Sequence, residues 1–232
     1  MVRQSMNTKL VALYILDQIL SVAAVGVVLF WSAGRLDWWA AWAAIAVWLA
    51  LFTAMDIVIL RFNPDLIAER LHPPKGAKTW DRAIVSILRL TELVRYILAG
   101  LDQRYGWTNG FPVAAQIAAV PVCVLSYALF IWAMASNPFF SQIVRIQSDR
   151  DHVVATAGPY RYVRHPGYAG MVVFELAIST LLASWWAIIA GGLCSCLIIL
   201  RTALEDRTLQ AELPAYAEYA RRVRYRLLPG VW

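Results

Sequence analysis

Long runs of apolar residues decide what this chain can fold into. The first covers residues 10–31, about 22 residues, and as a helix it is long enough to cross the hydrocarbon core of a bilayer. Similar runs cover residues 38–60, 112–135, 167–183 and 185–202, and the last two are predicted to form a helical hairpin joined at Ser184. Hydrophobic residues make up 60% of the 232 residues and charged residues only 16%, which is too apolar for a soluble domain of this length. We therefore predict an all-α, polytopic bundle of membrane helices.

A further membrane helix is predicted over residues 83–101, although this stretch carries charges. Arg89, Glu92 and Arg95 follow at steps of three, so they drift slowly around one side of a helix. Such a helix either lies in the membrane interface or spans with its charged side facing the protein interior. We take it as spanning, which gives about six transmembrane helices, with five as the alternative. Its charged side would line a substrate cavity or form an internal ladder of salt bridges.

The basic residues are distributed unevenly between the two ends of this bundle. With six spans and a cytoplasmic N-terminus, 17 of the 21 Lys and Arg residues fall on cytoplasmic segments, and only Arg35 and Arg104 fall on the opposite side. This is a strong positive-inside signal. It predicts that both termini are cytoplasmic. It also predicts that residues 61–82, residues 137–166 and the C-terminal tail share one face of the membrane.

The composition also excludes several classes of function. The net charge of +6 comes from Lys and Arg in loops between apolar runs, which indicates membrane topology and anionic lipid headgroups rather than nucleic acid. The three Cys lie inside apolar runs, without the second ligand pair that a metal site needs. The sequence contains no Rossmann, Walker or metalloprotease motif. We expect membrane lipids around the protein, no nucleic-acid partner and no metal.

A short surface helix is predicted within residues 61–82. Asn63 is placed as its cap, Pro64 lies in its first turn, and the proline pair at 73–74 ends it. The apolar side of this helix would lie on the membrane surface, with Glu69 and Arg70 nearer to water.

Residues 158–170, G-P-Y-R-Y-V-R-H-P-G-Y-A-G, are the least membrane-like stretch of the chain. They hold three Gly, two Pro, three Tyr, two Arg and a His in 13 residues at a predicted membrane boundary. A helix is predicted to start near Gly167, and the free N–H groups of a helix start bind anionic or polar ligand atoms. The three tyrosine rings could surround an adenine or a sulfonium. The alternative is an interfacial belt of Tyr and Arg.

A second cluster is predicted where the last span leaves the bilayer on the same side. Arg201, Glu205 and Leu209 share one face of a helix. An acidic side chain such as Glu205 can accept both hydroxyl hydrogens of a ribose. The alternative is an Arg201–Glu205 salt bridge with no other role.

The C-terminal tail is predicted to form a helix over residues 214–226. Tyr216, Tyr219, Arg222 and Arg226 recur along it at helical spacing. The helix would either close over a cytoplasmic cavity, with Arg available for a carboxylate or phosphate, or lie on anionic lipid.

Glu175 lies inside the fifth predicted span. A carboxylate within a membrane is costly unless it is paired, so Glu175 is a candidate for the site. It could also simply pair with Arg89 or Arg95.

Taken together, these motifs resemble the isoprenylcysteine carboxyl methyltransferase and phospholipid methyltransferase superfamily. The resemblance rests on the 158–170 motif, on R-T-A-L-E-D-R-T-L at residues 201–209 and on E-L-P-A-Y-A-E-Y at residues 212–219. It covers residues 137–232, whereas residues 1–136 match only in general plan. It implies one integrated domain in which helices of residues 1–136 shape an acceptor pocket and residues 137–232 bind the cofactor, with the C-terminal segment closing over it.

The resemblance implies a membrane enzyme that transfers a methyl group from S-adenosylmethionine to a lipophilic small-molecule or lipid acceptor, at a carboxylate, amine or thiol. Asp206 departs from the pattern, because relatives usually carry a second Glu there. Asp keeps the charge but has a shorter reach, so cofactor contacts are expected at residue 205 rather than 206. Carried over by position, the cofactor-contact residues are Gly158, Tyr160, His165, Pro166, Tyr168, Gly170, Arg201, Glu205 and Leu209.

The acceptor is expected to contact a different set of residues. Glu175, Arg89 and Arg222 are the candidates for this catalytic and acceptor-binding role. A carboxylate or thiolate acceptor needs no general base, whereas an amine or a hydroxyl needs one. No oligomeric state is predicted.

Two other functions are compatible with the same motif. NADPH-dependent membrane reductases of the sterol and steroid type carry R-H-P-x-Y in a related C-terminal fold, and their motif commonly reads R-H-P-N-Y, then Gly and an acidic residue. Here Gly167 stands in place of Asn and Met171 in place of the acid, which argues against a reductase. The second alternative is a non-enzymatic membrane scaffold of the same fold.

Overall fold

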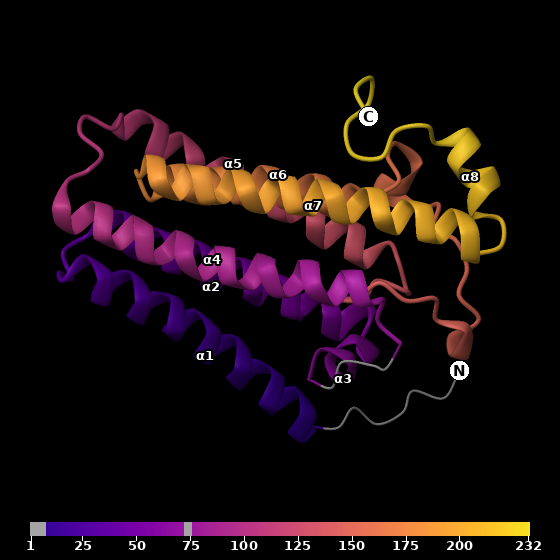
Figure 1. Cartoon of the computed structure of the whole chain (residues 1–232). Coiled ribbons are helices and arrows are strands. Elements are labelled where there is room, and N and C mark those ends of the chain that lie inside the picture. The colour runs from indigo at the N-terminus through magenta and orange to yellow at the C-terminus, as the bar shows by residue number, and fades with distance from the viewer. Residues whose placement is uncertain (1–7, 72–75) are drawn as a thin grey trace.

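Six long helices lie side by side and build the molecule (Figure 1). The computed structural model describes residues 8–71 and 76–232, apart from the side chains of residues 65 and 149. Within those residues every regular element is helical. The six are α1 (Thr8–Ala33), α2 (Trp39–Phe62), α4 (Thr79–Tyr105), α5 (Val113–Ala135), α6 (Pro166–Leu181) and α7 (Trp185–Glu212). The predicted all-α bundle is confirmed.

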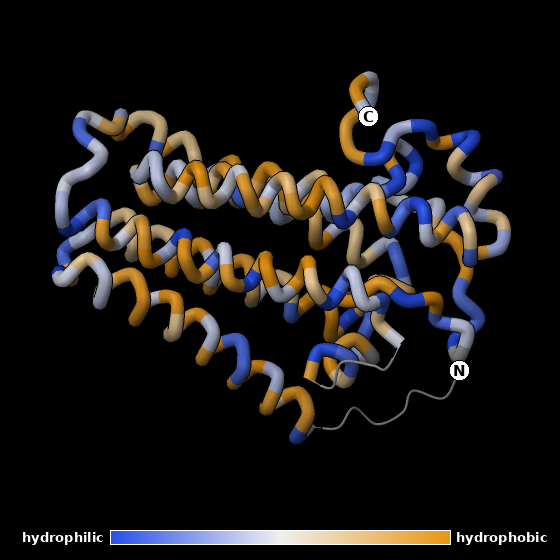
Figure 2. The backbone as a smooth tube through the Cα atoms, in the orientation of Figure 1, coloured by the Kyte–Doolittle hydropathy of each residue, from blue (hydrophilic) through white to orange (hydrophobic). Residues whose placement is uncertain are grey.

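The length and apolar composition of these helices identify the bundle as an integral membrane protein. By length and composition, α1, α2, α5 and α7 can each cross a bilayer, and α6 is an apolar helix of 16 residues. Figure 2 shows apolar residues along the full length of the long helices. Large apolar side chains lie on their outer faces, with Trp31 84% and Leu125 70% exposed. Such exposure is expected where lipid rather than water surrounds the helices.

α4 runs along the whole bundle despite its charges (Figure 1). It packs between α1 and α7, with Thr91, Arg95 and Asp102 buried and Arg89 exposed. Arg95 is 1% exposed and pairs with Glu175 of α6. The charged side thus contributes one buried ion pair to the interior, which satisfies both charges away from water.

The far end of the bundle is tied together by Asp102. Its carboxylate accepts hydrogen bonds from the backbone N–H and hydroxyl of Thr108 and from the hydroxyl of Ser184. Ser184 also caps the start of α7 by accepting from the N–H of Ala187. These bonds fasten the α4–α5 loop to the turn between α6 and α7, so the predicted hairpin joined at Ser184 is confirmed.

The near end of the bundle carries the polar segments. The short helix α3 (Asp65–Leu71), the segment 136–165 with its 3₁₀ turns η1 (Ser148–Arg150) and η2 (Gly158–Arg161), and the helix α8 (Tyr216–Arg222) all lie there (Figure 1). α7 runs ten residues further than the predicted end at 202, to Glu212. α8 is shorter than the predicted helix 214–226, because the tail turns away after Arg222.

Candidate functional site

The carboxylate of Asp206 is the centre of the polar cluster at this end. Asp206 lies on α7 and is completely buried. Arg164 donates hydrogen bonds to it from Nε and Nη2, at 2.7 and 2.9 Å, and Arg226 of the tail donates one from Nε at 2.9 Å. His165 Nε2 lies at 3.3 Å, the Tyr216 hydroxyl donates at 3.1 Å, and the Gln210 amide donates at 2.8 Å. One buried acid thus joins the start of α6, the polar end of α7 and the tail.

Backbone hydrogen bonds fix the tail onto the motif. The N–H groups of Arg164 and His165 donate to the carbonyls of Tyr225 and Arg226, each at 2.9 Å. The Tyr219 hydroxyl donates to the carbonyl of Tyr160 at 2.7 Å. The Arg226 guanidinium lies 4.8 Å from the centre of the terminal Trp232 ring. The tail therefore packs over residues 160–165 and is held there by these hydrogen bonds.

Electrostatics follow from this burial and pairing. Burial works against the charge of Arg164, but the hydrogen-bonded carboxylate of Asp206 outweighs it and raises the pKa of the Arg164 guanidinium. Burial, together with the negative charges of Asp206 and Glu205, raises the pKa of the Tyr216 hydroxyl. Arg164 is therefore held charged and Tyr216 neutral at physiological pH.

A second chain of contacts runs beside the first and contains Glu205. The hydroxyl of Tyr168 donates to Glu205 at 2.5 Å, and the Tyr168 ring lies 5.3 Å from the Arg201 guanidinium. Arg201 pairs with Asp81 at 2.7 Å, and Asp81 also accepts the N–H of Val144 at 2.8 Å. One alternative from the sequence was an Arg201–Glu205 salt bridge. In the structure Arg201 pairs instead with Asp81, which lies 120 positions away in the chain.

Two glycines of the motif serve close packing. Gly158 has a φ of +57°, and a side chain there would meet Ser136 Oγ at 2.3 Å. A Cβ at Gly170 would lie 2.4 Å from the carbonyl oxygen of Ser126, so α5 and α6 touch through their backbones. Both positions accommodate only glycine for steric reasons.

The structure brings most of the predicted cofactor residues to one end of the bundle, where their neighbours differ from one residue to the next. His165, Pro166 and Tyr168 begin α6, and Arg201 and Glu205 face them from α7. Tyr160 is buried below, within 3.4 Å of the Asn137 amide, and burial raises the pKa of its hydroxyl. Leu209 packs on the cluster of Leu213, Tyr216 and Tyr219.

The three acceptor candidates do not come together. Glu175 is enclosed with Arg95 between α4 and α6, Arg89 is exposed on α4, and Arg222 is exposed at the end of α8. The sequence did not predict the buried ion pairs at this end of the bundle, which involve four residues: Arg164, Asp206, Arg226 and Asp81. The Arg of R-H-P is the one signal that could have indicated Arg164, because a buried Arg needs an acid.

A family description of known proteins matches the part of the chain that holds this cluster. The isoprenylcysteine carboxyl methyltransferase family model matches residues 118–211, from α5 to the end of α7. The stretch includes Arg164, His165, Glu205 and Asp206 and leaves out α1 to α4.

Several curated proteins are similar over parts of their length. The protein-S-isoprenylcysteine O-methyltransferase of Schizosaccharomyces pombe is 33% identical over 64 residues, covering 28% of this chain and 27% of that protein. That of Dictyostelium discoideum is 30% identical over 94 residues, covering 40% and 39%. Enzyme A of Arabidopsis thaliana is 22% identical over 138 residues, covering 56% and 66%. The matches thus span between about a quarter and two thirds of these relatives.

A solved structure shares the fold. The eukaryotic intramembrane Ras methyltransferase, an isoprenylcysteine carboxyl methyltransferase, aligns with a TM-score of 0.54 at 18% identity, over 81% of this chain and 65% of that one. At this identity the likeness concerns the fold. The predicted resemblance to the superfamily is confirmed.

The Asp206 cluster predicts a specific effect of Asp206→Asn. The amide keeps the shape but removes the charge that Arg164 and Arg226 share, and breaking a buried ion pair costs about 3–5 kcal/mol. We expect a lower midpoint of thermal unfolding in detergent and faster proteolysis of the tail after residue 222. Arg207→Gln, the exposed neighbour on α7, is the matched control and should behave as wild type. Wild-type stability and wild-type proteolysis of Asp206→Asn would contradict the central role of this carboxylate.

Proposed function

We propose that this chain is an integral membrane methyltransferase that transfers a methyl group from S-adenosylmethionine to a lipophilic acceptor. The observation that carries the proposal is the convergence of the 158–170 motif with Glu205 of α7 at one end of a membrane bundle. This convergence lies inside the stretch that resembles the isoprenylcysteine carboxyl methyltransferases. Residues 137–232 then bind the cofactor, and the helices of residues 1–136 shape the acceptor pocket.

The residues at this end fit the chemistry of the cofactor. One oxygen of Glu205 takes the Tyr168 hydroxyl, and a carboxylate with about four lone-pair sites retains capacity for ribose hydroxyls. The Tyr168 ring suits a sulfonium, and the first-turn N–H groups of α6 suit a carboxylate. When bound, S-adenosylmethionine supplies an electrophilic methyl group.

The protein's own residues hold the site in position and keep water out. Asp206 fixes Arg164, His165 and the tail relative to one another. Tyr216 and Tyr219, both buried, seal the motif beneath α8. Methyl transfer requires the acceptor, methyl carbon and sulfur to be in line and a dry surrounding for the sulfonium. A rigid cap of this kind suits both requirements.

The acceptor is proposed to be a lipophilic carboxylate. By their names, the relatives transfer a methyl group to an oxygen of protein-S-isoprenylcysteine. A carboxylate needs no general base, which suits a site whose acids are engaged by arginines and hydroxyls. Among the sequence candidates, Glu175 is enclosed in the bundle and is proposed as a polar element of the acceptor pocket. For Arg89 and Arg222, an acceptor-binding role is proposed from the sequence alone.

The end that carries the site is proposed to be cytoplasmic, with both termini on that side. The excess of Lys and Arg at this end supports the orientation. In a cysteine-free background, Glu218→Cys should react with a membrane-impermeant maleimide only after cells are permeabilised. Leu36→Cys, at the opposite end, should react with intact cells. The reverse pattern would contradict this orientation.

Cofactor binding gives a direct test of the proposed function. Purified protein in detergent should release or absorb heat with S-adenosylhomocysteine, and Glu205→Gln should weaken this binding about tenfold, because one charge-assisted hydrogen bond contributes about 1.5 kcal/mol. Glu218→Gln, exposed on α8, is the control and should bind as wild type. Binding of NADPH with no binding of S-adenosylhomocysteine would overturn the methyltransferase in favour of a reductase.

A further inference from the structure

The end of the tail turns back along the outside of the bundle. Two backbone hydrogen bonds pair residues 164–165 with residues 225–226 in the same order, so the tail leaves this contact in the direction in which α6 runs. In Figure 1 the C-terminal end accordingly lies outside the bundle and level with its long helices, whereas α8 lies at their very end. Because α6 is an apolar helix that starts at Pro166, the end of the tail lies where the lipid-facing surface begins.

This end, residues 226–232, is a closed loop with an apolar tip, and we call it the tail loop. The carbonyl oxygen of Trp232 accepts the N–H groups of residues 226–228 at 2.9, 3.1 and 3.3 Å. These bonds give the loop a fixed shape, which leaves Leu228 57% and Val231 74% exposed. Apolar side chains held out beside the lipid-facing surface are suited to the boundary between head groups and acyl chains.

Three arginines lie next to the tail loop without an acidic partner. Arg221 and Arg222 are exposed at the end of α8, and Arg224 is exposed in the turn that follows. In the part of the chain that the structure describes, no carboxylate forms a salt bridge with any of the three. Tyr162 and Tyr225 add exposed aromatic rings of the kind that gathers at membrane interfaces. Guanidinium groups in such a place can bind phosphate with two parallel hydrogen bonds.

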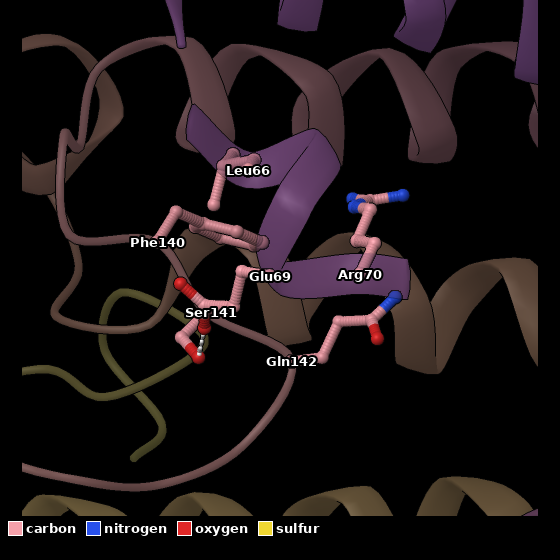
Figure 3. A pocket seen from close by; sticks show the side chains of 6 residues that line it. All are labelled: Leu66, Glu69, Arg70, Phe140, Ser141 and Gln142. Carbon is pink, nitrogen blue, oxygen red and sulfur yellow. Dashed lines mark hydrogen bonds between the residues drawn. The ribbon is translucent and has the colours of Figure 1, made fainter. Parts of the chain in front are cut away.

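Arg70, on α3 at the same end, is used differently. The sequence predicted it nearer to water, but Figure 3 shows its guanidinium turned away from Glu69, and its Nη1 approaches the Tyr14 hydroxyl at 3.1 Å and Met55 Sδ at 3.3 Å. The Asp56 carboxylate of α2 also attracts it. Arg70 is thus engaged inside the bundle, which corrects the prediction, whereas the tail arginines are exposed outside it.

The tail loop is also joined to the proposed cofactor site. Arg226, at the base of the loop, donates to the carboxylate of Asp206 at 2.9 Å. Tyr219 of α8 donates to the carbonyl of Tyr160 at 2.7 Å. A contact that holds the tail loop in place therefore also favours these bonds, and the two places are coupled through the tail.

We propose that residues 221–231 are a docking site for anionic phospholipids of the surrounding membrane. The three arginines bind head-group phosphates, while the apolar tip of the tail loop enters the outer acyl region. A bilayer is the occupant because it borders this part of the protein, and basic side chains beside apolar ones are complementary to an anionic leaflet. Occupation of the site holds the tail over residues 160–165 and strengthens cofactor binding. The lipid contact stands on the geometry of the tail, and its effect on the cofactor rests on the proposed function.

Fluorescence quenching in nanodiscs tests the lipid contact. The full chain, one copy per disc and otherwise free of cysteine, carries Leu228→Cys labelled with bimane, and the lipids carry a nitroxide near the head-group end of the acyl chain. Because the arginines draw the loop to anionic lipid, quenching should be about threefold stronger with phosphatidylglycerol mixed into phosphatidylcholine than with phosphatidylcholine alone. Arg221→Gln combined with Arg224→Gln should remove this difference. Arg82→Gln combined with Arg207→Gln removes the same charge from exposed positions of α4 and α7, and this matched control should keep it.

The effect on the cofactor site is measured with the unlabelled protein in the same two membranes. S-adenosylhomocysteine should bind about tenfold more tightly in the mixture than in phosphatidylcholine alone, which is an ordinary size for coupling between two sites. The variant with Arg221→Gln and Arg224→Gln should bind it equally in both membranes, because its tail no longer responds to the lipid charge.

Each outcome decides one part of the proposal. Equal quenching in both membranes, or a control that loses the difference as fully as the tail variant, would overturn the docking site. The expected quenching together with equal S-adenosylhomocysteine affinity in both membranes would overturn the coupling to the cofactor. If S-adenosylhomocysteine binds in neither membrane, the proposed function fails instead, and the quenching still decides the docking site.

Discussion

The buried carboxylate of Asp206 is the interaction on which the functional end of this protein depends. A single acid on α7 receives two arginines, a histidine and a tyrosine from three different segments. Removing a charge from water is costly, and the cost is offset only when several donors converge on it. The consequence is positional: the start of α6, the polar extension of α7 and the tail cannot move independently. Without this anchor, Glu205 and Tyr168 would lose their fixed relation to the tail that covers the motif.

The membrane explains why polar chemistry gathers at one end. In the lipid-exposed part of the bundle, charged side chains are tolerated only when turned inward and paired, as Arg95 and Glu175 are. At the near end α7 continues beyond its apolar part, and its polar residues meet the segment 136–165 and the tail. The short helix α3, which carries Arg70, lies at the same end. This arrangement suits the proposed acceptor, whose lipophilic chain would remain in the bilayer while its carboxylate reaches the polar end.

Much of the bundle could be predicted from the sequence, because apolar runs of membrane length have few alternative folds. The spans, the inclusion of α4 and the hairpin at Ser184 follow from hydropathy and turn residues. Pairings between distant residues could not be predicted: Arg201 bonds Asp81 rather than Glu205, and no local pattern indicates that partner. The same holds for Arg70. Hydropathy placed it toward water, whereas its donors meet Tyr14, Met55 and Met134 from three other helices. Asp206 was set aside for its short reach, although a short side chain is what a crowded buried cluster accommodates.

The central claim is that this bundle transfers methyl groups to lipophilic acceptors. The most direct measurement is to incubate the purified protein with S-adenosylmethionine labelled in its methyl group and with fractionated membrane lipids, small lipophilic molecules and prenylcysteine acids. The account predicts label in an apolar fraction as a methyl ester that mild alkali hydrolyses. It also predicts that the label falls about tenfold when Glu205→Gln replaces the wild type at low cofactor concentration, in line with its weaker cofactor binding. Cofactor binding with no label in any fraction would contradict the account and would leave a membrane scaffold of the same fold.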